Sequence, residues 1–203
     1  MPSSGLLSRV KPHTMTGGMS LANRITLGRA LLIPAIVVLA LTEHRIAAAV
    51  LFFVVSAGDV LDGLVARARG EVTTLGKALD PAVDKILYLS VIAALASQGD
   101  VPLWLAVLFA VPHVGLAVGA VVLHASVRVV QGARWPGKAA AVLTFASVLA
   151  LFLPLPDVVG GAACVALMVA VGLSYVAAVD YAVSGVRTRR VLRSRGQETL
   201  RER

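Results

Sequence analysis

Six long apolar segments dominate this chain and leave it few ways to fold. They span residues 21–42, 45–67, 78–97, 102–124, 138–154 and 158–181. These lengths are close to the ~20 residues that a helix needs to cross a bilayer. Because lipid offers the backbone no hydrogen-bond partners, such segments form helices. Hydrophobic residues make up 58% of the chain, and the mean hydropathy is +0.84. We therefore predict an all-α integral membrane protein with six transmembrane helices.

The charged residues divide the chain into parts and orient it. Residues 1–20 are predicted to be a flexible N-terminal tail, 21–184 the membrane domain and 185–203 a basic C-terminal tail. Of the 19 lysines and arginines, Lys85 lies inside an apolar segment and Arg45 lies in a connection on one side. The remaining 17 of these 19 fall on the other side. Since positive charge is retained in the cytoplasm, both termini are predicted to be cytoplasmic, in a multi-pass protein of the inner (plasma) membrane.

The net charge of +8 has a similar explanation. A basic chain is a candidate for nucleic-acid binding. Here, however, the basic residues stand in short stretches between apolar segments, where anionic lipid headgroups are the nearest partners. We therefore expect membrane lipids, and no nucleic acid, as partners.

Four aspartates interrupt the apolar pattern where the second segment ends and the third begins. The stretch reads Asp59-x2-Asp62-Gly63-x2-Ala66-Arg67-x8-Gly76-x3-Asp80-x3-Asp84. Residues three or four apart share a helix face, so each pair of aspartates is expected to point one way. Four carboxylates converging at membrane depth need compensation for lost hydration and mutual repulsion. Two Mg²⁺ or Mn²⁺ ions would match four aspartates in charge and prefer oxygen ligands. The pattern predicts a two-metal site at the cytoplasmic end of the bundle.

The same stretch resembles the signature of the CDP-alcohol phosphatidyltransferases, at all eight defined positions and with the same gaps. Upstream, Asn23-x2-Thr26-x2-Arg29-x4-Pro34 is similar to the opening of the phosphatidylglycerophosphate synthase and cardiolipin synthase branches. The resemblance covers about residues 20–97. It implies a membrane enzyme that transfers a phosphatidyl group from CDP-diacylglycerol to an alcohol and releases CMP. It also favours a homodimer.

The resemblance further implies roles for the matching residues. Asp59, Asp62 and Asp80 would be metal ligands, and Asp84 would be both a ligand and the general base for the acceptor hydroxyl. The residues implied for binding the CDP-lipid are Asn23, Thr26, Gly63, Ala66, Arg67, Thr73 and Gly76. The residues alone indicate the metal cluster and the arginine, whereas cytidine comes only from the resemblance. Helix packing by the small residues, and capping or interhelical hydrogen bonding by Asn23 and Thr26, stay open as alternatives.

The acceptor is indicated by a second basic cluster on the same side. Arg128, Arg134 and Lys138 are candidates for holding a phosphate, as glycerol 3-phosphate would require. The element 135–138 resembles the one that opens the fifth helix in both branches. However, 111–114 lacks the Arg-Glu pair of the phosphatidylglycerophosphate synthase pattern, and no second lysine follows Lys138. Glycerol 3-phosphate is the preferred acceptor, and phosphatidylglycerol, used in cardiolipin synthesis, is the alternative.

A divalent-cation transporter is a hypothesis of a different class, because transporters also place aspartates inside a helix bundle. Such sites lie near the bilayer midplane between repeated halves. Here the aspartates gather toward one face, and the two halves show no evident inverted repeat. The sequence therefore favours the transferase.

Overall fold

The structure is a computed structural model that describes the backbone of residues 21–69, 74–126 and 135–201. Its side chains are described for residues 25–58, 81–115 and 135–184. The described backbone forms six helices and no strand: α1 (Leu21–Leu41), α2 (Arg45–Arg69), α3 (Thr74–Ser97), α4 (Leu103–Ser126), α5 (Trp135–Phe152) and α6 (Asp157–Arg201). The predicted all-α architecture is confirmed.

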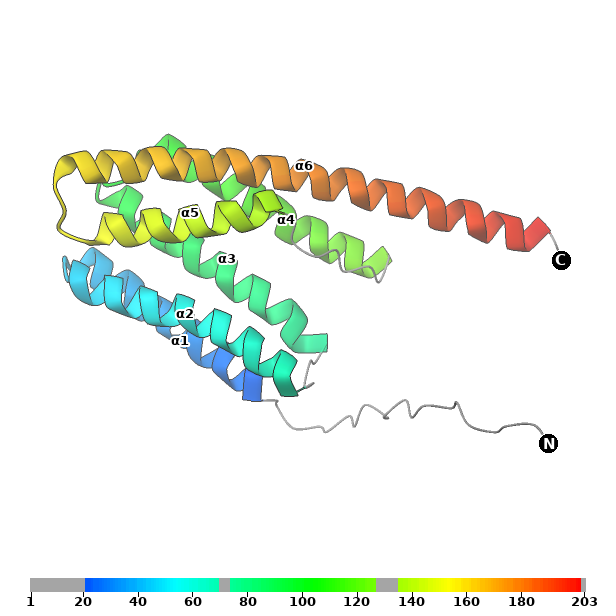
Figure 1. The fold of residues 1–203 in the computed structure, drawn as a ribbon, viewed down its shortest axis with the longest axis horizontal. Coiled ribbons are helices and arrows are strands. Elements are labelled where there is room, and N and C mark those ends of the chain that lie inside the picture. The colour runs from blue at the N-terminus through cyan, green and yellow to red at the C-terminus, as the bar shows by residue number, and fades with distance from the viewer. Residues whose placement is uncertain (1–20, 70–73, 127–134, 202–203) are drawn as a thin grey trace, which may run out of the picture.

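The helices run up and down (Figure 1). The α1–α2, α3–α4 and α5–α6 turns lie together at one end, which we call the distal end. The start of α1, the end of α2 and the start of α3 lie together at the other end, which we call the aspartate end. Helix α1 packs against both α2 and α3, α5 packs against α6, and α4 packs against α3 and α6. Consecutive helices are therefore antiparallel, as membrane crossings by successive segments require.

Aromatic packing joins the two halves of the bundle. Phe52 of α2 is fully buried, and its ring meets that of Tyr88 on α3 edge-on at 5.7 Å between centroids. The same ring stacks on Phe145 of α5 at 5.7 Å. Offset-stacked and edge-on pairs are the favourable aromatic geometries. Phe52 thus fixes α2 against both α3 and α5 at mid-depth of the bundle.

The outside of the bundle is apolar. Leu31 of α1, Val142 of α5 and Val158 of α6 are among many large hydrophobic residues that are largely exposed. Within the described residues, two helical stretches are long and apolar enough to span a membrane, Trp135–Phe152 and Asp157–Ser184. Three shorter apolar stretches are Ile25–Leu41, Arg45–Gly58 and Leu103–Gly115. An extensive exposed apolar surface marks contact with lipid or protein, which fits a membrane protein.

One helix differs clearly from its predicted apolar segment. Helix α6 continues to Arg201, whereas its apolar segment ends at 181 (Figure 1). The added stretch is rich in arginine, which favours helix, and contains no proline. Apolarity marks how much of a helix lies in lipid, so it does not predict where a helix that leaves the bilayer ends. Part of the predicted basic tail is thus a continuation of α6.

Candidate functional site

The two pairs of aspartates lie on helix turns at the aspartate end. Asp59 and Asp62 fall in the last part of α2, and Asp80 and Asp84 fall in the first part of α3. Asp62 is seven residues before the end of α2 and Asp80 six residues after the start of α3. At 1.5 Å per residue, both turns lie roughly 10 Å below the helix ends. The backbone therefore places the two pairs at a similar depth.

Several predicted site residues lie outside the side chains that the structure describes. They are Asn23, Asp59, Asp62, Gly63, Ala66, Arg67, Thr73, Gly76, Asp80, Arg128 and Arg134. Thr26, Asp84 and Lys138 are described. Among the described residues, no group of three or more His, Cys, Asp or Glu side chains is placed to hold a metal ion. Three of the four predicted metal-binding carboxylates, those of Asp59, Asp62 and Asp80, are not among the described side chains.

Asp84 is half-buried on α3, between a buried residue on one side and a charged one on the other. Val83 packs into the core, whereas Lys85 is half-buried like Asp84. On the facing side of α4, His113 donates from Nδ1 to the carbonyl oxygen of Phe109 at 2.7 Å and stacks on that ring. The imidazole is thus engaged within its own helix.

Arg29 is a candidate functional residue that the sequence reasoning placed in the upstream pattern and among the cytoplasmic charges, without giving it a role in the site. Its side chain is 4% exposed, and its Nε donates to the carbonyl oxygen of Val55 on α2 at 2.9 Å. Its Cδ lies 3.8 Å from where a Cβ on Gly58 would stand. By the helical repeat, the Val55 carbonyl also accepts the backbone N–H of Asp59. Arg29 is therefore packed against the turn of α2 that leads into the aspartate motif.

A sequence signal for Arg29 exists in the spacing of α1. Among the described side chains of α1, residues 25–41, the buried ones are Thr26, Arg29, Ile33, Ile36 and Ala40, separated by three, four, three and four positions. This spacing is that of the core-facing stripe of a packed helix. An arginine at a position of this stripe faces the core, so the neighbouring helices bury its side chain. Burial of a charge inside a membrane bundle is costly and points to function.

Thr26 occupies the stripe position one turn before Arg29. It is 2% exposed, so its hydroxyl lies inside the bundle at the aspartate end. Thr26 and Arg29 together give α1 a short buried polar face beside the motif-bearing end of α2. This placement agrees with both roles considered for Thr26, namely helix-to-helix hydrogen bonding and closure of a ligand pocket.

Lys138 lies in the first turn of α5 and is exposed. One residue earlier, a Cβ on Gly137 would stand 3.7 Å from the Cβ of Ala177 on α6, so α5 begins tightly packed on α6. The N-terminus of a helix carries partial positive charge. The lysine and the helix end together make this an electropositive position.

The predicted donors suit hard divalent cations. Carboxylate oxygens are the ligands that Mg²⁺ and Mn²⁺ prefer. Two turns at a similar depth, each bearing two aspartates, supply four such groups from two helices. The residues Asp59, Asp62, Asp80 and Asp84 are therefore the ones that would hold the ions.

Comparison with known proteins addresses the identity of the site. Residues 19–177 match the family model described as CDP-alcohol phosphatidyltransferase. A Mycobacterium tuberculosis protein named "Probable phosphatidylglycerophosphate synthase" is 32% identical over 177 residues, which cover 83% of this chain and 82% of that protein. A Bacillus subtilis protein named CDP-diacylglycerol–glycerol-3-phosphate 3-phosphatidyltransferase is 32% identical over 43% of this chain and 53% of its own length.

A Rickettsia bellii protein of the latter name is 38% identical, over 40% of this chain and 47% of its own length. The family match extends well past the aspartate motif into α6, and enzymes of this family are integral to membranes and generally use divalent metal. The resemblance seen in the sequence is confirmed. This chain belongs to the CDP-alcohol phosphatidyltransferase family.

Proposed function

We propose that this protein makes phosphatidylglycerophosphate by transferring a phosphatidyl group from CDP-diacylglycerol to glycerol 3-phosphate, with release of CMP. The relatives named above carry names that describe this reaction. The observation that carries the proposal is the arrangement of the aspartate end. The turns bearing the four aspartates lie there at a similar depth, beside the buried Arg29.

The membrane arrangement is part of the proposal. All six helices span the inner (plasma) membrane, and the aspartate end and both termini face the cytoplasm. The distal end supports this orientation, because the one arginine or lysine in its connections, Arg45, is paired with Asp100. The shorter apolar stretches of α1, α2 and α4 become full spans when the helices are followed into the aspartate end. A cytoplasmic site can receive a soluble nucleotide and a soluble acceptor.

The chain's own residues divide the work of the reaction. Divalent cations, when held by the four aspartates, supply positive charge that neutralises the pyrophosphate of the donor. Arg67 contacts that pyrophosphate, and Asn23, Thr26, Gly63, Ala66, Thr73 and Gly76 surround the CDP-lipid. Asp84 accepts the proton of the acceptor hydroxyl. At the same time, the oxygen of that hydroxyl forms a bond to the phosphatidyl phosphorus. The bond from that phosphorus to the CMP oxygen breaks, and CMP leaves.

The start of α5 is the proposed acceptor side of the site. Lys138 is exposed there on an electropositive helix end, and Arg128 and Arg134 precede it in the chain. A phosphate monoester needs cationic donors, and charge-assisted hydrogen bonds are stronger than neutral ones. The phosphate contacts are therefore assigned to this cluster.

An acceptor panel tests the reaction. Purified protein in detergent or liposomes receives CDP-diacylglycerol, Mg²⁺ or Mn²⁺, and either glycerol 3-phosphate or phosphatidylglycerol, and released CMP is measured. We expect CMP with glycerol 3-phosphate and loss of activity with a chelator. CMP with phosphatidylglycerol alone would make the protein a cardiolipin synthase. Metal flux into liposomes without any requirement for CDP-lipid would support the transporter instead.

Thiol labelling tests the orientation. In a Cys164→Ala background, the only native cysteine is removed. A cysteine replacing the exposed Asp157 at the distal end should react with an impermeant thiol reagent in intact cells, whereas one replacing Gly196 near the end of α6 should react only after lysis. Reversed labelling would put the aspartate end outside the cell and contradict the mechanism. Crosslinking in the membrane tests the expected homodimer.

A further inference from the structure

Helix α6 continues as an arginine-rich extension past the ends of the other helices (Figure 1). The apolar stretch of α6 that could span a membrane ends at Ser184. We call residues 185–201, which follow it, the arm. The arm contains six arginines and one glutamate, a net charge of +5. Its arginines are Arg187, Arg189, Arg190, Arg193, Arg195 and Arg201.

The packing of α5 on α6 sets the height of the arm above the bundle. A Cβ on Gly137 would stand 3.7 Å from the Cβ of Ala177, so these two positions are level. Nearby Trp135 is 75% exposed, and tryptophan is enriched where a membrane meets water. At 1.5 Å per residue, Arg187 lies roughly 15 Å beyond Ala177 along the helix and Arg201 roughly 36 Å beyond it. The headgroups add only about 5–8 Å to each side of the hydrocarbon core, so most of the arm stands in solution.

The arm lacks the pattern of a helix that lies on a membrane surface. Such a helix carries apolar residues on one face and charged residues on the other. Here Arg187 and Arg189 are two positions apart, which places them on nearly opposite sides of the helix. Val191 and Leu200 are nine positions apart, again on opposite sides. Arginine positions therefore occur on more than one side of the arm, which suits a partner that needs no particular face, such as a small soluble anion.

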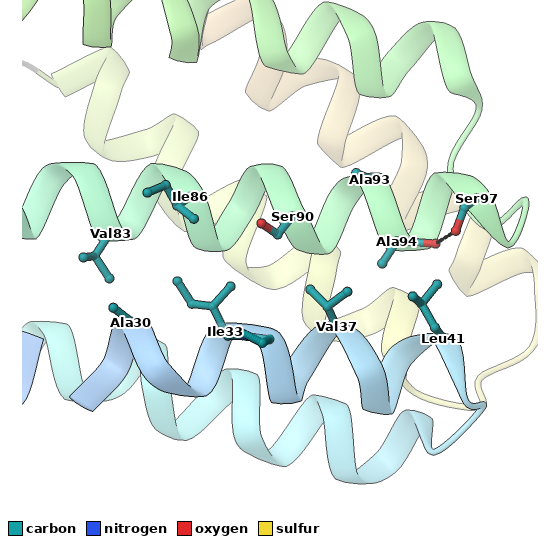
Figure 2. Close-up of a pocket in the computed structure, with 11 residues that line it drawn as sticks. Ala30, Ile33, Val37, Leu41, Val83, Ile86, Ser90, Ala93, Ala94 and Ser97 are labelled. Atoms are coloured by element: carbon teal, nitrogen blue, oxygen red, sulfur yellow. Dashed lines mark hydrogen bonds between the residues drawn. The ribbon is translucent and has the colours of Figure 1, made fainter. Parts of the chain in front are cut away.

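The arm rises beside the route of a soluble acceptor. The start of α5, the proposed acceptor side of the site, is packed on α6 at Gly137. The wall of the bundle offers an anion no alternative route. Its groove between α1 and α3, about 660 Å³ in volume, is lined mainly by aliphatic side chains such as Ile33 and Val37, with serine hydroxyls as the polar groups (Figure 2). A phosphate dianion would lose its hydration there without compensation.

We propose that the arm is an electrostatic guide, which raises the local concentration of small soluble phosphate anions at the aspartate end. The identity of the anion as the acceptor rests on the function proposed above. Charge of one sign beside a site enriches ions of the opposite sign and speeds their association, and the effect falls steeply with ionic strength. The arm would thus act on the soluble acceptor and not on the lipid donor, which arrives within the membrane.

Coulomb's law gives the size of the effect. The Debye length is about 30 Å at 0.01 M ionic strength and about 8 Å at 0.15 M. We place the seven charges of the arm at their heights above Gly137 and a dianion at the start of α5. In water the attraction then enriches the dianion about fivefold at 0.01 M and less than about 1.5-fold at 0.15 M. The guide therefore has a characteristic dependence on salt.

Neutralising the arm tests the proposal by kinetics. One variant changes all six arm arginines to glutamine, and the matched control changes them to lysine. Both replacements favour helix about as well as arginine does. In nonionic detergent at about 0.01 M ionic strength, we expect the glutamine variant to raise the KM for glycerol 3-phosphate about fivefold, equivalent to ~1 kcal/mol. Its kcat and its KM for CDP-diacylglycerol should not change, and the lysine variant should match the wild type.

Three results of this experiment would overturn the proposal. Equal KM values for glycerol 3-phosphate in all three proteins would show that the arm does not act on the acceptor. A rise that persists at high salt would mean a structural role. A rise confined to vesicles that contain anionic lipid would assign the arm to the membrane surface.

Anion enrichment can also be measured without the reaction. Trp104→Phe leaves Trp135, at the aspartate end, as the sole tryptophan, and Trp135→Phe leaves Trp104, near the distal end and 52% exposed, as the matched control. At low salt, iodide should quench Trp135 about twofold more strongly with the native arm than with the glutamine arm, since iodide carries half the charge of the dianion. Quenching by neutral acrylamide, and quenching of Trp104, should be equal with both arms.

The quenching result separates the guide from the reaction. A protein that releases no CMP with glycerol 3-phosphate but shows the iodide difference at Trp135 would refute the reaction and retain the guide. Equal iodide quenching of Trp135 with both arms would overturn the guide, whether or not CMP is released.

Discussion

Two arginines at opposite ends of the bundle show how differently this fold uses positive charge. At the distal end, Arg45 of α2 donates a hydrogen bond from Nη1 to Oδ1 of Asp100 at 2.9 Å, and its Nη2 lies 2.9 Å from Oδ2 as an ion pair. Both side chains are partly exposed, at 34% and 21%. At the aspartate end, Arg29 is 4% exposed and donates to the backbone of α2.

At the distal end, two side-chain contacts hold the helix ends together, and we call this pair of contacts the clasp. Besides the ion pair, Gln98 donates its side-chain amide to the carbonyl oxygen of Ala40 at 2.8 Å, which joins the end of α3 to the end of α1. A partly exposed ion pair with one hydrogen bond holds a turn at modest benefit. Nothing in this arrangement requires a ligand.

The aspartate end is built differently. A charge in the core-facing stripe of α1 costs stability, and the fold retains it beside the turn that carries Asp59. The difference teaches that position in the packing, and not the count of charges, separates an anchoring arginine from a functional one. The following variants test this contrast.

The largest effect is expected from carboxylates at the two ends. Asp84→Asn removes the proposed proton acceptor, so CMP release should fall about a thousandfold or more. Asp100→Asn makes the same chemical change at the distal end and should keep most of the activity. Both proteins should elute from size exclusion like the wild type. If Asp84→Asn kept a tenth of wild-type turnover, Asp84 would not be the base.

The two arginines give the next contrast. Arg29→Gln removes the guanidinium that anchors the α2 turn leading into Asp59. Because a charge-assisted contact contributes about 1.5–3 kcal/mol, that turn should lose its fixed position, and we expect the Mg²⁺ concentration for half-maximal activity to rise about tenfold. A fall would mean that Arg29 acts on the ions by charge repulsion alone. Arg29→Lys keeps the charge but loses the planar fork, so it should restore part of the Mg²⁺ response. Arg45→Gln should lower thermal stability by about 1 kcal/mol without changing the Mg²⁺ response. If Arg29→Gln lost stability alone, its role would be structural.

The sequence alone predicts most of the helix bounds but not the end of the last helix. The apolar segments predict the first five helices to within four residues at each end. They do so because apolarity reports which residues must lie in lipid. The same signal fails at the end of α6, which leaves the apolar region but remains helical to Arg201.

For the candidate site too, sequence reasoning predicted some residues and missed the role of one. Fixed spacing in one stretch predicted the aspartate turns, because the chain itself places them on adjacent helix ends. Arg29 was counted with the cytoplasmic charges, since its neighbour on α2 is 26 positions away. Its place in the stripe from Thr26 to Ala40 distinguishes it physically from the surface arginines, and its place in the upstream pattern agrees with that. Reading charges against helix periodicity, and not only against membrane side, would have found it.

A smaller effect is expected at the start of α5. Lys138→Gln should raise the KM for glycerol 3-phosphate about tenfold, because one charge-assisted phosphate contact is lost. The KM for CDP-diacylglycerol serves as the internal control and should change little, since Arg67 and the aspartates are assigned to that substrate. An equal rise in both KM values would move Lys138 from the acceptor to the donor. Unchanged values would make it an ordinary charge at the membrane surface.

The smallest effect concerns the distal turns, which should respond in stability alone. Two residues there end helices in the left-handed conformation, Glu43 with φ 62° and Gly99 with φ 87°. Each is followed by a residue whose N–H reaches five positions back, His44 to Leu39 and Asp100 to Leu95, both at 3.0 Å. This helix-ending motif favours glycine, and a side chain in that conformation costs on the order of 1 kcal/mol.

Glu43→Gly should therefore raise the melting temperature by about 2–4 °C, and Gly99→Ala should lower it by a similar amount. CMP release at a temperature where both variants are folded should match the wild type. A change in the Mg²⁺ response of either variant would show that the distal turns are coupled to the aspartate end. The contrast between the two ends would then fail, because the clasp would be part of the working site.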